Sequence, residues 1–181
     1  MTANTTRSTT DAVALGPAAT GHVDTVTVDS PVGALELRAR AGFLTHVLFV
    51  GSAPIETVDT DNPVLRAAVE QLNAYFAGES TAFDLPLRPE GTPFQQRVWA
   101  ALADIPYGET RTYAEIARAI GAPTAYRAVG AANGQNPLPI VLPCHRVIGS
   151  NGSLTGYGGG MERKRILLEL EARVRLQREF A

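Results

Sequence analysis

Three short segments near the start of the chain have the pattern of hydrophobic and polar residues that β-strands show. They span residues 23–28, 34–39 and 44–50; the first two alternate polar and apolar residues, and the third is mostly apolar. This two-residue period is typical of strands with one buried face. Ser30–Gly33 and Gly42 interrupt the segments with turn-forming residues. We therefore expect a small antiparallel meander with tight connections.

A helical spacing of apolar residues follows the third segment. Asn62 and Pro63 suit the N-cap and the first helical position, and Gly78 suits the residue just past a helix end. Four apolar residues recur between them at helical spacing: Leu65, Val69, Leu72 and Phe76. We expect a helix here, then a short strand over 83–87 and a linker rich in proline and glycine.

Two capping boxes open helices in the second half of the chain. Thr92 with Gln95, and Thr112 with Glu115, have the three-residue spacing at which side chains bond helix-end N–H groups reciprocally. Gly121 ends the second of these helices, which is short.

Two more helices are expected farther along, from Thr124 to about Ala132 and from about Met161 to Arg178. The two short helices around the glycine turn match the helix-turn-helix pattern, in which the second helix enters a DNA groove. A purely structural helix pair fits the same spacing.

The whole pattern predicts a mixed α/β (α+β) fold in two domains. Residues 21–90 would form an N-terminal α/β domain, and residues 91–181 a mostly helical C-terminal domain that contains the candidate helix-turn-helix. Residues 1–20 are rich in Thr and Ala without a long apolar run or cleavage signal, so we expect a disordered tail. No window of eighteen apolar residues predicts a membrane helix.

Charge is distributed unequally between the two halves. Residues 1–90 carry five Arg and eleven Asp or Glu, a net charge of −6, whereas residues 91–181 carry eleven Lys or Arg and seven Asp or Glu, a net charge of +4. The second half is therefore better suited to binding a polyanion such as DNA.

The chain has one cysteine, which excludes an internal disulfide and suits a reducing cytoplasm.

That cysteine, Cys144, follows an apolar stretch over 139–143 that we expect to be a strand between prolines. His145 and Arg146 come next, and a base or positive charge beside a thiol favours the reactive thiolate. Consecutive strand residues point to opposite faces, however, so His145 can act on the thiol only if the backbone bends or a water bridges them. An isolated cysteine is otherwise most often a small buried apolar residue.

Two further features can complete a site. Glu169 and Glu171 in the last helix are both candidates to orient a histidine, and spacing alone does not choose between them. The glycine-rich run 156–160 permits close backbone approach to a ligand, and Tyr157 within it offers a face for stacking on a base. The run lacks the pattern of a phosphate-binding loop.

These motifs together resemble the O6-alkylguanine-DNA alkyltransferases. The central match is Pro-Cys-His-Arg-Val at 143–147, with Asn136-Pro137 before it and Gly-Tyr-Gly-Gly at 156–159 after it. Shorter matches occur at Phe94-Gln95, 105–108, Tyr113 and 127–130. The resemblance extends from about Thr92 to Glu171, and more loosely over the first half through its strand–strand–strand–helix order. It implies an RNase H-like N-terminal domain, and a C-terminal domain over residues 91–181 that binds DNA and transfers the alkyl group.

The resemblance implies a role for each catalytic residue. Cys144 would accept the alkyl group, His145 would deprotonate it through a water, and Glu171 would orient His145. Tyr113 would protonate the departing guanine and help to turn the DNA backbone. Because a thioether is a very poor leaving group, each molecule would act once.

The resemblance also implies how DNA would be held. Arg127 would fill the space left by the flipped nucleotide, since a base inside a duplex must be extruded before its O6 position can be attacked. Small residues at Ala128, Gly130 and Ala131 would let the helix approach the groove closely. Tyr126 departs from the small residue expected before the arginine, and it can reach a phosphate.

The pocket for the base would come from four residues. Tyr157 would stack on the flipped base, and backbone groups of Val147 and Gly158 would bond its edge. Asn136 would bond the backbone between the recognition helix and the reactive cysteine. We expect no cofactor, and no metal, because the first half has no cysteine and only two histidines, whereas some family members hold zinc there.

We therefore expect direct-reversal repair of O6-alkylguanine, with O4-alkylthymine as a second candidate substrate. The expected partner is double-stranded DNA, without a membrane; the protein would act as a monomer, and cooperative binding stays open. A non-catalytic sensor of alkylated DNA is the main alternative, but such relatives lack the cysteine. A thiol hydrolase would need a direct thiolate–imidazole pair, and a plain helix-turn-helix regulator would leave the Pro-Cys-His-Arg motif unexplained.

Overall fold

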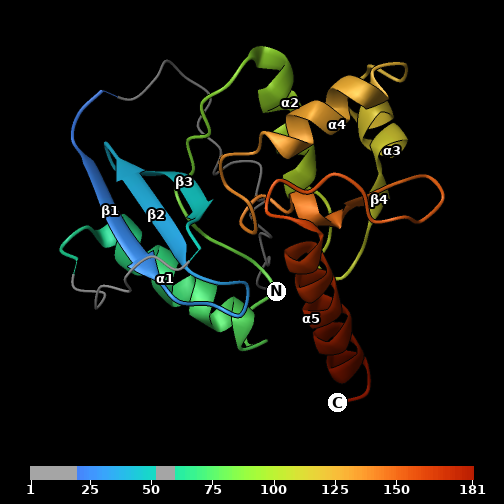
Figure 1. Cartoon of the computed structure of the whole chain (residues 1–181). Helices are drawn as coiled ribbons and strands as arrows, with labels where there is room; N and C mark the ends of the chain where they lie inside the picture. The colour runs from blue at the N-terminus through green and yellow to red at the C-terminus, as the bar shows by residue number, and fades with distance from the viewer. Residues whose placement is uncertain (1–19, 52–59) are drawn as a thin grey trace, which may run out of the picture.

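The computed structural model describes residues 20–51 and 60–181, so the tail predicted over 1–20 lies almost wholly outside the described residues. Three strands form an antiparallel sheet in the order β1-β2-β3 (Figure 1). Their bounds are β1 Val23–Val28, β2 Leu35–Arg40 and β3 Phe43–Phe49. The meander predicted from the alternating pattern is confirmed.

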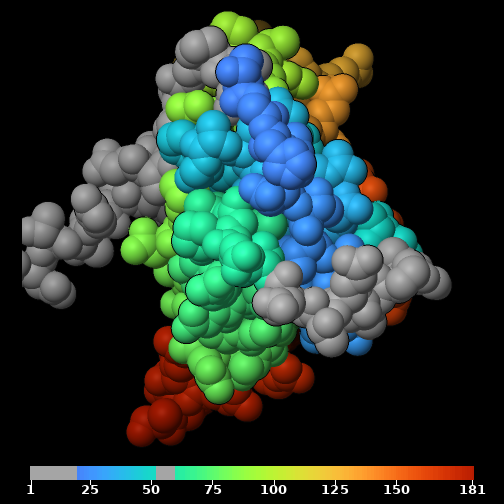
Figure 2. All heavy atoms as spheres, turned by 90° about the vertical axis from the view of Figure 1, so that its left-hand side faces the viewer, coloured from blue at the N-terminus to red at the C-terminus, as the bar shows by residue number. Residues whose placement is uncertain are grey.

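Helix α1, Pro63–Phe76, covers one face of this sheet (Figure 1). The Asn62 side chain caps it by accepting hydrogen bonds from Val64 N at 3.0 Å and Leu65 N at 3.3 Å. Gly78 adopts φ +76°, the left-handed conformation that favours glycine after a helix. Figure 2 shows α1 and β1 side by side on one face of the molecule. The local signals for this helix are therefore confirmed.

The segment 83–87 is not a strand, contrary to the prediction. It meets β3 through one isolated bridge, Leu44 to Leu87, and Leu44 N donates to Pro86 O at 2.8 Å. Pro86 has no N–H to donate, which limits how far a ladder can continue.

Four helices make up most of the second half. They are α2 Pro93–Ala103, α3 Tyr113–Ala119, α4 Tyr126–Gly134 and α5 Met161–Glu179. Both predicted capping boxes are present. The turn between α3 and α4 contains Gly121 at φ +73°, and the predicted helix pair is confirmed. Helix α4 begins two residues later than predicted, because Thr124 lies in the turn.

The predicted strand over 139–143 is wrong, and a tight buried turn takes its place. Leu142 N donates to Leu138 O at 2.8 Å, and Ile140 has φ +75°. The apolar residues of this segment are buried because the turn lies inside the core, not because they belong to a sheet. A single turn of 3₁₀ helix, Cys144–Arg146, follows directly.

A two-stranded parallel ladder that the pattern did not predict comes next. Strand β4, Arg111–Thr112, pairs with β5, Val147–Ile148. It ties the segment after the cysteine to the start of α3.

One continuous apolar core links the sheet to the helices. Val47 N of β3 donates to Pro137 O at 2.9 Å, and Trp99 Nε1 of α2 donates to Ala132 O at 2.8 Å. The first bond sets β3 against the turn that leads to the cysteine, and the second joins α2 to α4. Of the helices in the described part of the chain, none has both the length and the apolar character needed to cross a bilayer.

Candidate active site and nucleic-acid interface

Cys144 opens the 3₁₀ turn and is 3% exposed. It lies on a cavity of about 270 Å³. The walls come from the end of β3, from the end of α4 with the turn after it, and from the glycine-rich loop around Tyr157. The thiol is therefore reached through a pocket and not across an open surface.

His145 follows Cys144 within the 3₁₀ turn and not in a strand, so the alternation of side chains between two faces of a strand does not apply to this pair. The side chain of His145 is fully buried and its Nε2 lies 2.6 Å from Glu171 Oε1. Because a carboxylate can only accept, Nε2–H donates and Nδ1 is the unprotonated nitrogen. Among the described residues, Nδ1 is buried without a hydrogen-bond partner. Glu169, the other candidate, has a side chain that is 71% exposed.

Glu171 is the centre of a buried hydrogen-bond network. Arg146 donates Nε to Oε2 at 2.9 Å and Nη2 to Oε1 at 3.0 Å. Gly108 N donates to Oε2 at 3.1 Å, and Tyr75 Oη donates to Oε1 at 2.7 Å. Burial alone would raise the pKa of Glu171, but the hydrogen bonds and charges of His145 and Arg146 outweigh it and lower the pKa to about 2. The carboxylate is thus ionised at neutral pH.

The thiol and the imidazole are both uncharged at neutral pH. Burial raises the pKa of the Cys144 thiol to about 11, although a hydrogen bond with Asn136 and the charge of Lys164 lower it in part. Burial also lowers the pKa of His145 below its ordinary 6.5, against the opposing effect of Glu171. The thiol must therefore lose its proton before its sulfur can attack an electrophile, and the neutral imidazole of His145 can accept that proton.

The sequence analysis did not assign a site role to two residues of this network, Arg146 and Tyr75, or to the nearby Lys164. Arg146 was considered only as a charge beside the thiol, but it holds Glu171 and donates to Ile105 O at 2.6 Å. Lys164 is fully buried and donates Nζ to Val147 O at 2.5 Å and to Thr155 O at 3.0 Å. Tyr75 comes from α1. The only available signal was that Lys164 is the sole lysine in an arginine-rich chain.

Two asparagines shape the backbone around the cysteine. Asn136 donates Nδ2 to Leu142 O at 2.8 Å and accepts from Leu138 N at 2.9 Å, so it braces the turn before Cys144. Asn133, at the end of α4, donates to Cys144 O at 3.3 Å and also lines the cavity. The sequence analysis had picked out Asn136 but not Asn133.

The glycine loop closes tightly over the cavity. A Cβ at Gly158 would lie 3.0 Å from Gly134 O, and a Cβ at Gly159 would lie 2.6 Å from the ring of Phe49. Tyr157 packs edge-on against Phe49, with ring centroids 6.1 Å apart. Glycine is therefore required here by close approach, and Tyr157 is placed on the cavity wall beside Cys144.

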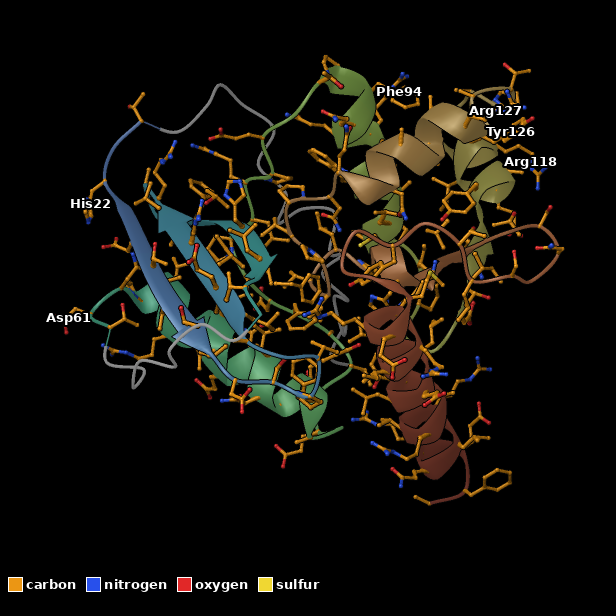
Figure 3. The ribbon with its side chains drawn as sticks, viewed as in Figure 1. His22, Asp61, Phe94, Arg118, Tyr126 and Arg127 are labelled. Atoms are coloured by element: carbon orange, nitrogen blue, oxygen red, sulfur yellow. The ribbon has the colours of Figure 1, made fainter. Side chains whose placement is uncertain are left out.

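Helix α4 presents small and basic residues to solvent at one end of the molecule. Figure 3 shows Arg127, Tyr126 and Arg118 projecting from the α3–α4 end. Tyr126 is 48% exposed, and the arginines are exposed as well. Ala128 and Ala131 are also exposed. This face combines positive charge with a smooth helix surface, as a DNA-binding face requires.

Tyr113 links this face to the cavity loop. It begins α3, is half-buried, and donates Oη to Thr155 O at 2.9 Å. Its ring lies beside Gly130 of α4, where a Cβ would be 3.7 Å away. Burial raises the pKa of Tyr113 above its ordinary 10.0, so it stays protonated at neutral pH.

Comparison with known proteins agrees with this arrangement. The family model described as 6-O-methylguanine DNA methyltransferase, ribonuclease-like domain, matches residues 25–89, and the one for the DNA binding domain of the same family matches residues 93–173. A methylated-DNA–protein-cysteine methyltransferase of Mycolicibacterium paratuberculosis is 59% identical over 150 residues, which are 81% of this chain and 91% of the relative. The chain belongs to the 6-O-methylguanine DNA methyltransferase family.

Solved structures of the family share this architecture. The Mycobacterium tuberculosis protein in complex with DNA is 57% identical, with a TM-score of 0.75, and the match covers 83% of this chain and 93% of that one. The Methanococcus jannaschii O6-methylguanine DNA methyltransferase is 28% identical, with a TM-score of 0.59, over 81% of this chain and 93% of that one. DNA is therefore a partner of this methyltransferase, and the predicted family, fold class and repair activity are confirmed. The domain boundaries and the role of each site residue stay predictions.

Proposed function

We propose that this methyltransferase repairs O6-alkylguanine in double-stranded DNA by moving the alkyl group onto Sγ of Cys144, once per molecule. The observation that carries the proposal is the buried pair of His145 and Glu171, which adjoins the only cysteine of the chain on the wall of a pocket. A neutral thiol needs a base, and a neutral imidazole oriented by a carboxylate is such a base.

The proposed reaction moves one proton and one alkyl group. His145 Nδ1 takes the thiol proton, through a water, and Sγ attacks the alkyl carbon. The bond from that carbon to guanine O6 breaks, and its electron pair stays on the base. Tyr113 protonates the departing guanine and regains a proton from solvent, while His145 releases to solvent the proton that it took from the thiol. In net terms the thiol exchanges its proton for the alkyl group, and guanine regains a proton.

The pocket would hold the extruded base between Tyr157 and the turn before Cys144. The ring of Tyr157 offers a stacking face, while backbone groups of Val147 and Gly158 would bond the base edge. The carbonyl of Val147 already accepts from Lys164, and its second lone pair can serve the base. Asn136 would keep the turn in place.

Binding to DNA would use the exposed face of α4. Arg127 would enter the duplex in place of the flipped nucleotide, and Ala128, Gly130 and Ala131 would allow the helix to approach the groove. The protein would act on DNA as a monomer. Because the thiol must stay reduced, a reducing compartment such as the cytoplasm suits the reaction.

Intact mass measurement tests the proposal directly. The protein would be incubated with a duplex containing one O6-methylguanine, alongside the Cys144→Ser variant. We expect the wild type to gain one methyl group on Cys144 as guanine is restored, and the variant to gain none. Binding of the lesion without any change in mass would overturn alkyl transfer and favour the alkylated-DNA sensor. Repetition with O4-methylthymine tests the second candidate substrate.

A further inference from the structure

A tyrosine of the N-terminal half reaches the reactive network of the C-terminal half. Tyr75 lies near the end of α1, is 1% exposed, and donates Oη to Glu171 Oε1 at 2.7 Å. The two residues are 96 positions apart in sequence. Figure 1 shows the C-terminal end of α1 directed toward α5, which carries Glu171.

The oxygen that Tyr75 bonds is the one that faces His145. Glu171 Oε1 accepts from His145 Nε2 at 2.6 Å and from Tyr75 Oη at 2.7 Å, with Arg146 Nη2 at 3.0 Å. The other oxygen, Oε2, is held by Arg146 Nε and by Gly108 N. Tyr75 and His145 therefore share one acceptor atom, and the position of that atom depends on both.

A group of aromatic rings holds Tyr75 in place. Its centroid lies 5.2 Å from that of Phe76, 5.4 Å from that of Phe83 and 5.9 Å from that of Tyr107. Two of these contacts are edge-on, a preferred geometry for aromatic pairs. Burial first, and then the charge of Glu171, raise the pKa of Tyr75 well above 10.0, so the hydroxyl remains a donor at neutral pH.

We propose that Tyr75 is a positioning residue for alkyl transfer, because its hydroxyl holds Glu171 in the orientation that His145 requires. The N-terminal half would then act in the reaction through this hydrogen bond, in addition to shaping the fold. The inference rests on the proposed role of His145 as the base.

The charges around the pair give the direction of the effect. His145 is faced by the carboxylate of Glu171, by Arg146 beside it, and by Lys164 from an earlier turn of α5; Tyr107 also lies near Glu171. Without the hydrogen bond from Tyr75, the negative charge on Glu171 Oε1 would interact more strongly with protonated His145. The pKa of His145 should rise, so a larger share of the base would be protonated at a given acidic pH.

The test compares Tyr75→Phe with the matched variant Tyr107→Phe. Tyr107 belongs to the same ring cluster, and among the described residues its buried hydroxyl has no hydrogen-bond partner. Each substitution thus removes one buried hydroxyl and keeps the ring, but only the first removes a bond to Glu171. Single-turnover methyl transfer from duplex O6-methylguanine would be measured for both across the pH range, together with thermal unfolding.

We expect Tyr75→Phe to transfer methyl about tenfold more slowly at neutral pH, the effect of one lost hydrogen bond to a charged group. The acidic limb of its pH–rate profile should move to higher pH, while Tyr107→Phe keeps the wild-type rate and profile. Equal rates and profiles for the two variants would overturn the inference, even if both melt at lower temperature.

A second measurement separates this inference from the proposed function. The ring ¹⁵N shifts of His145 would be recorded in the free protein, where no alkyl transfer takes place. Tyr75→Phe should displace the Nε2 shift and Tyr107→Phe should not; an unchanged shift in Tyr75→Phe would refute the positioning role. If the wild type failed to take up methyl at all, the proposed function would fall, and the shifts would still decide whether Tyr75 orients the pair.

Discussion

Replacement of Glu171 by glutamine should destabilise the protein strongly and in a pH-dependent way. The side chain is buried and its pKa is about 2, against an ordinary value of 4.5. At about 1.4 kcal/mol per pKa unit, this difference corresponds to about 3 kcal/mol at neutral pH. Removal of one partner from a buried ion pair costs a similar amount, about 3–5 kcal/mol. The two estimates therefore agree in magnitude.

The sign of the pH dependence follows from the lowered pKa. The carboxylate contributes its full stability above pH 4.5, and this contribution is lost as the pH falls toward 2. His145, whose pKa is also lowered, adds a loss in the same direction below pH 6.5. Glu171→Gln should therefore lie about 3 kcal/mol below the wild type at neutral pH and approach it in acid.

Urea unfolding at several pH values measures this difference, with Glu169→Gln as the matched control. Glu169 is on the same helix, but its side chain is 71% exposed, so its replacement should change stability by less than about 0.5 kcal/mol. If the free energy of unfolding of Glu171→Gln stayed below that of the wild type by the same amount from neutral to acidic pH, the link to the lowered pKa would be refuted. If the two proteins had equal free energies of unfolding at neutral pH, the stabilising role of the buried network would be refuted.

Three further predictions concern the thiol, the loop and the DNA face. Cys144, with a pKa of about 11, should react slowly with a small thiol reagent at neutral pH and faster as the pH rises toward 11; a fast reaction with a plateau near neutrality would contradict the raised pKa. Gly159→Ala should destabilise the protein by about 1–3 kcal/mol, because the new Cβ would meet the Phe49 ring at 2.6 Å. Gly134→Ala, which has open space, is the control, and equal unfolding energies would refute the argument. Arg127→Ala should slow repair in duplex DNA far more than methyl transfer from the free alkylated base, and equal slowing on both would exclude its intercalation.

Local signals in the sequence were sufficient for most helices and strands. The capping boxes at Thr92 and Thr112 and the Asn62-Pro63 start act within one helical turn, so their effect does not depend on distant parts of the chain. The alternating pattern of β2 was similarly reliable, because one face of the sheet is buried and fixes which residues point inward.

The segment before the cysteine shows where local patterns fail. An apolar run over 139–143 fits a buried strand and a buried turn equally well, since both hide their side chains. The turn was decided by Asn136, which bonds the backbone on both sides of it, and by contact with β3. Cys144 and His145 therefore lie in a 3₁₀ turn, in which side chains do not alternate between two faces as they do in a strand.

The sequence by itself therefore determined the family, the position of the lone cysteine and the elements around it. The resemblance pointed to Glu171 as the acid beside His145, but the spacing of residues alone did not choose between Glu169 and Glu171. Glu169 and Glu171 are two residues apart on one helix, and only the packing of α5 against the 3₁₀ turn buries one and exposes the other. No local pattern in the sequence indicated a role for Tyr75, because its hydroxyl contacts Glu171 only after α1 and α5 have packed together. Hydrogen bonds between distant segments depend on the tertiary structure, and this network consists largely of such bonds.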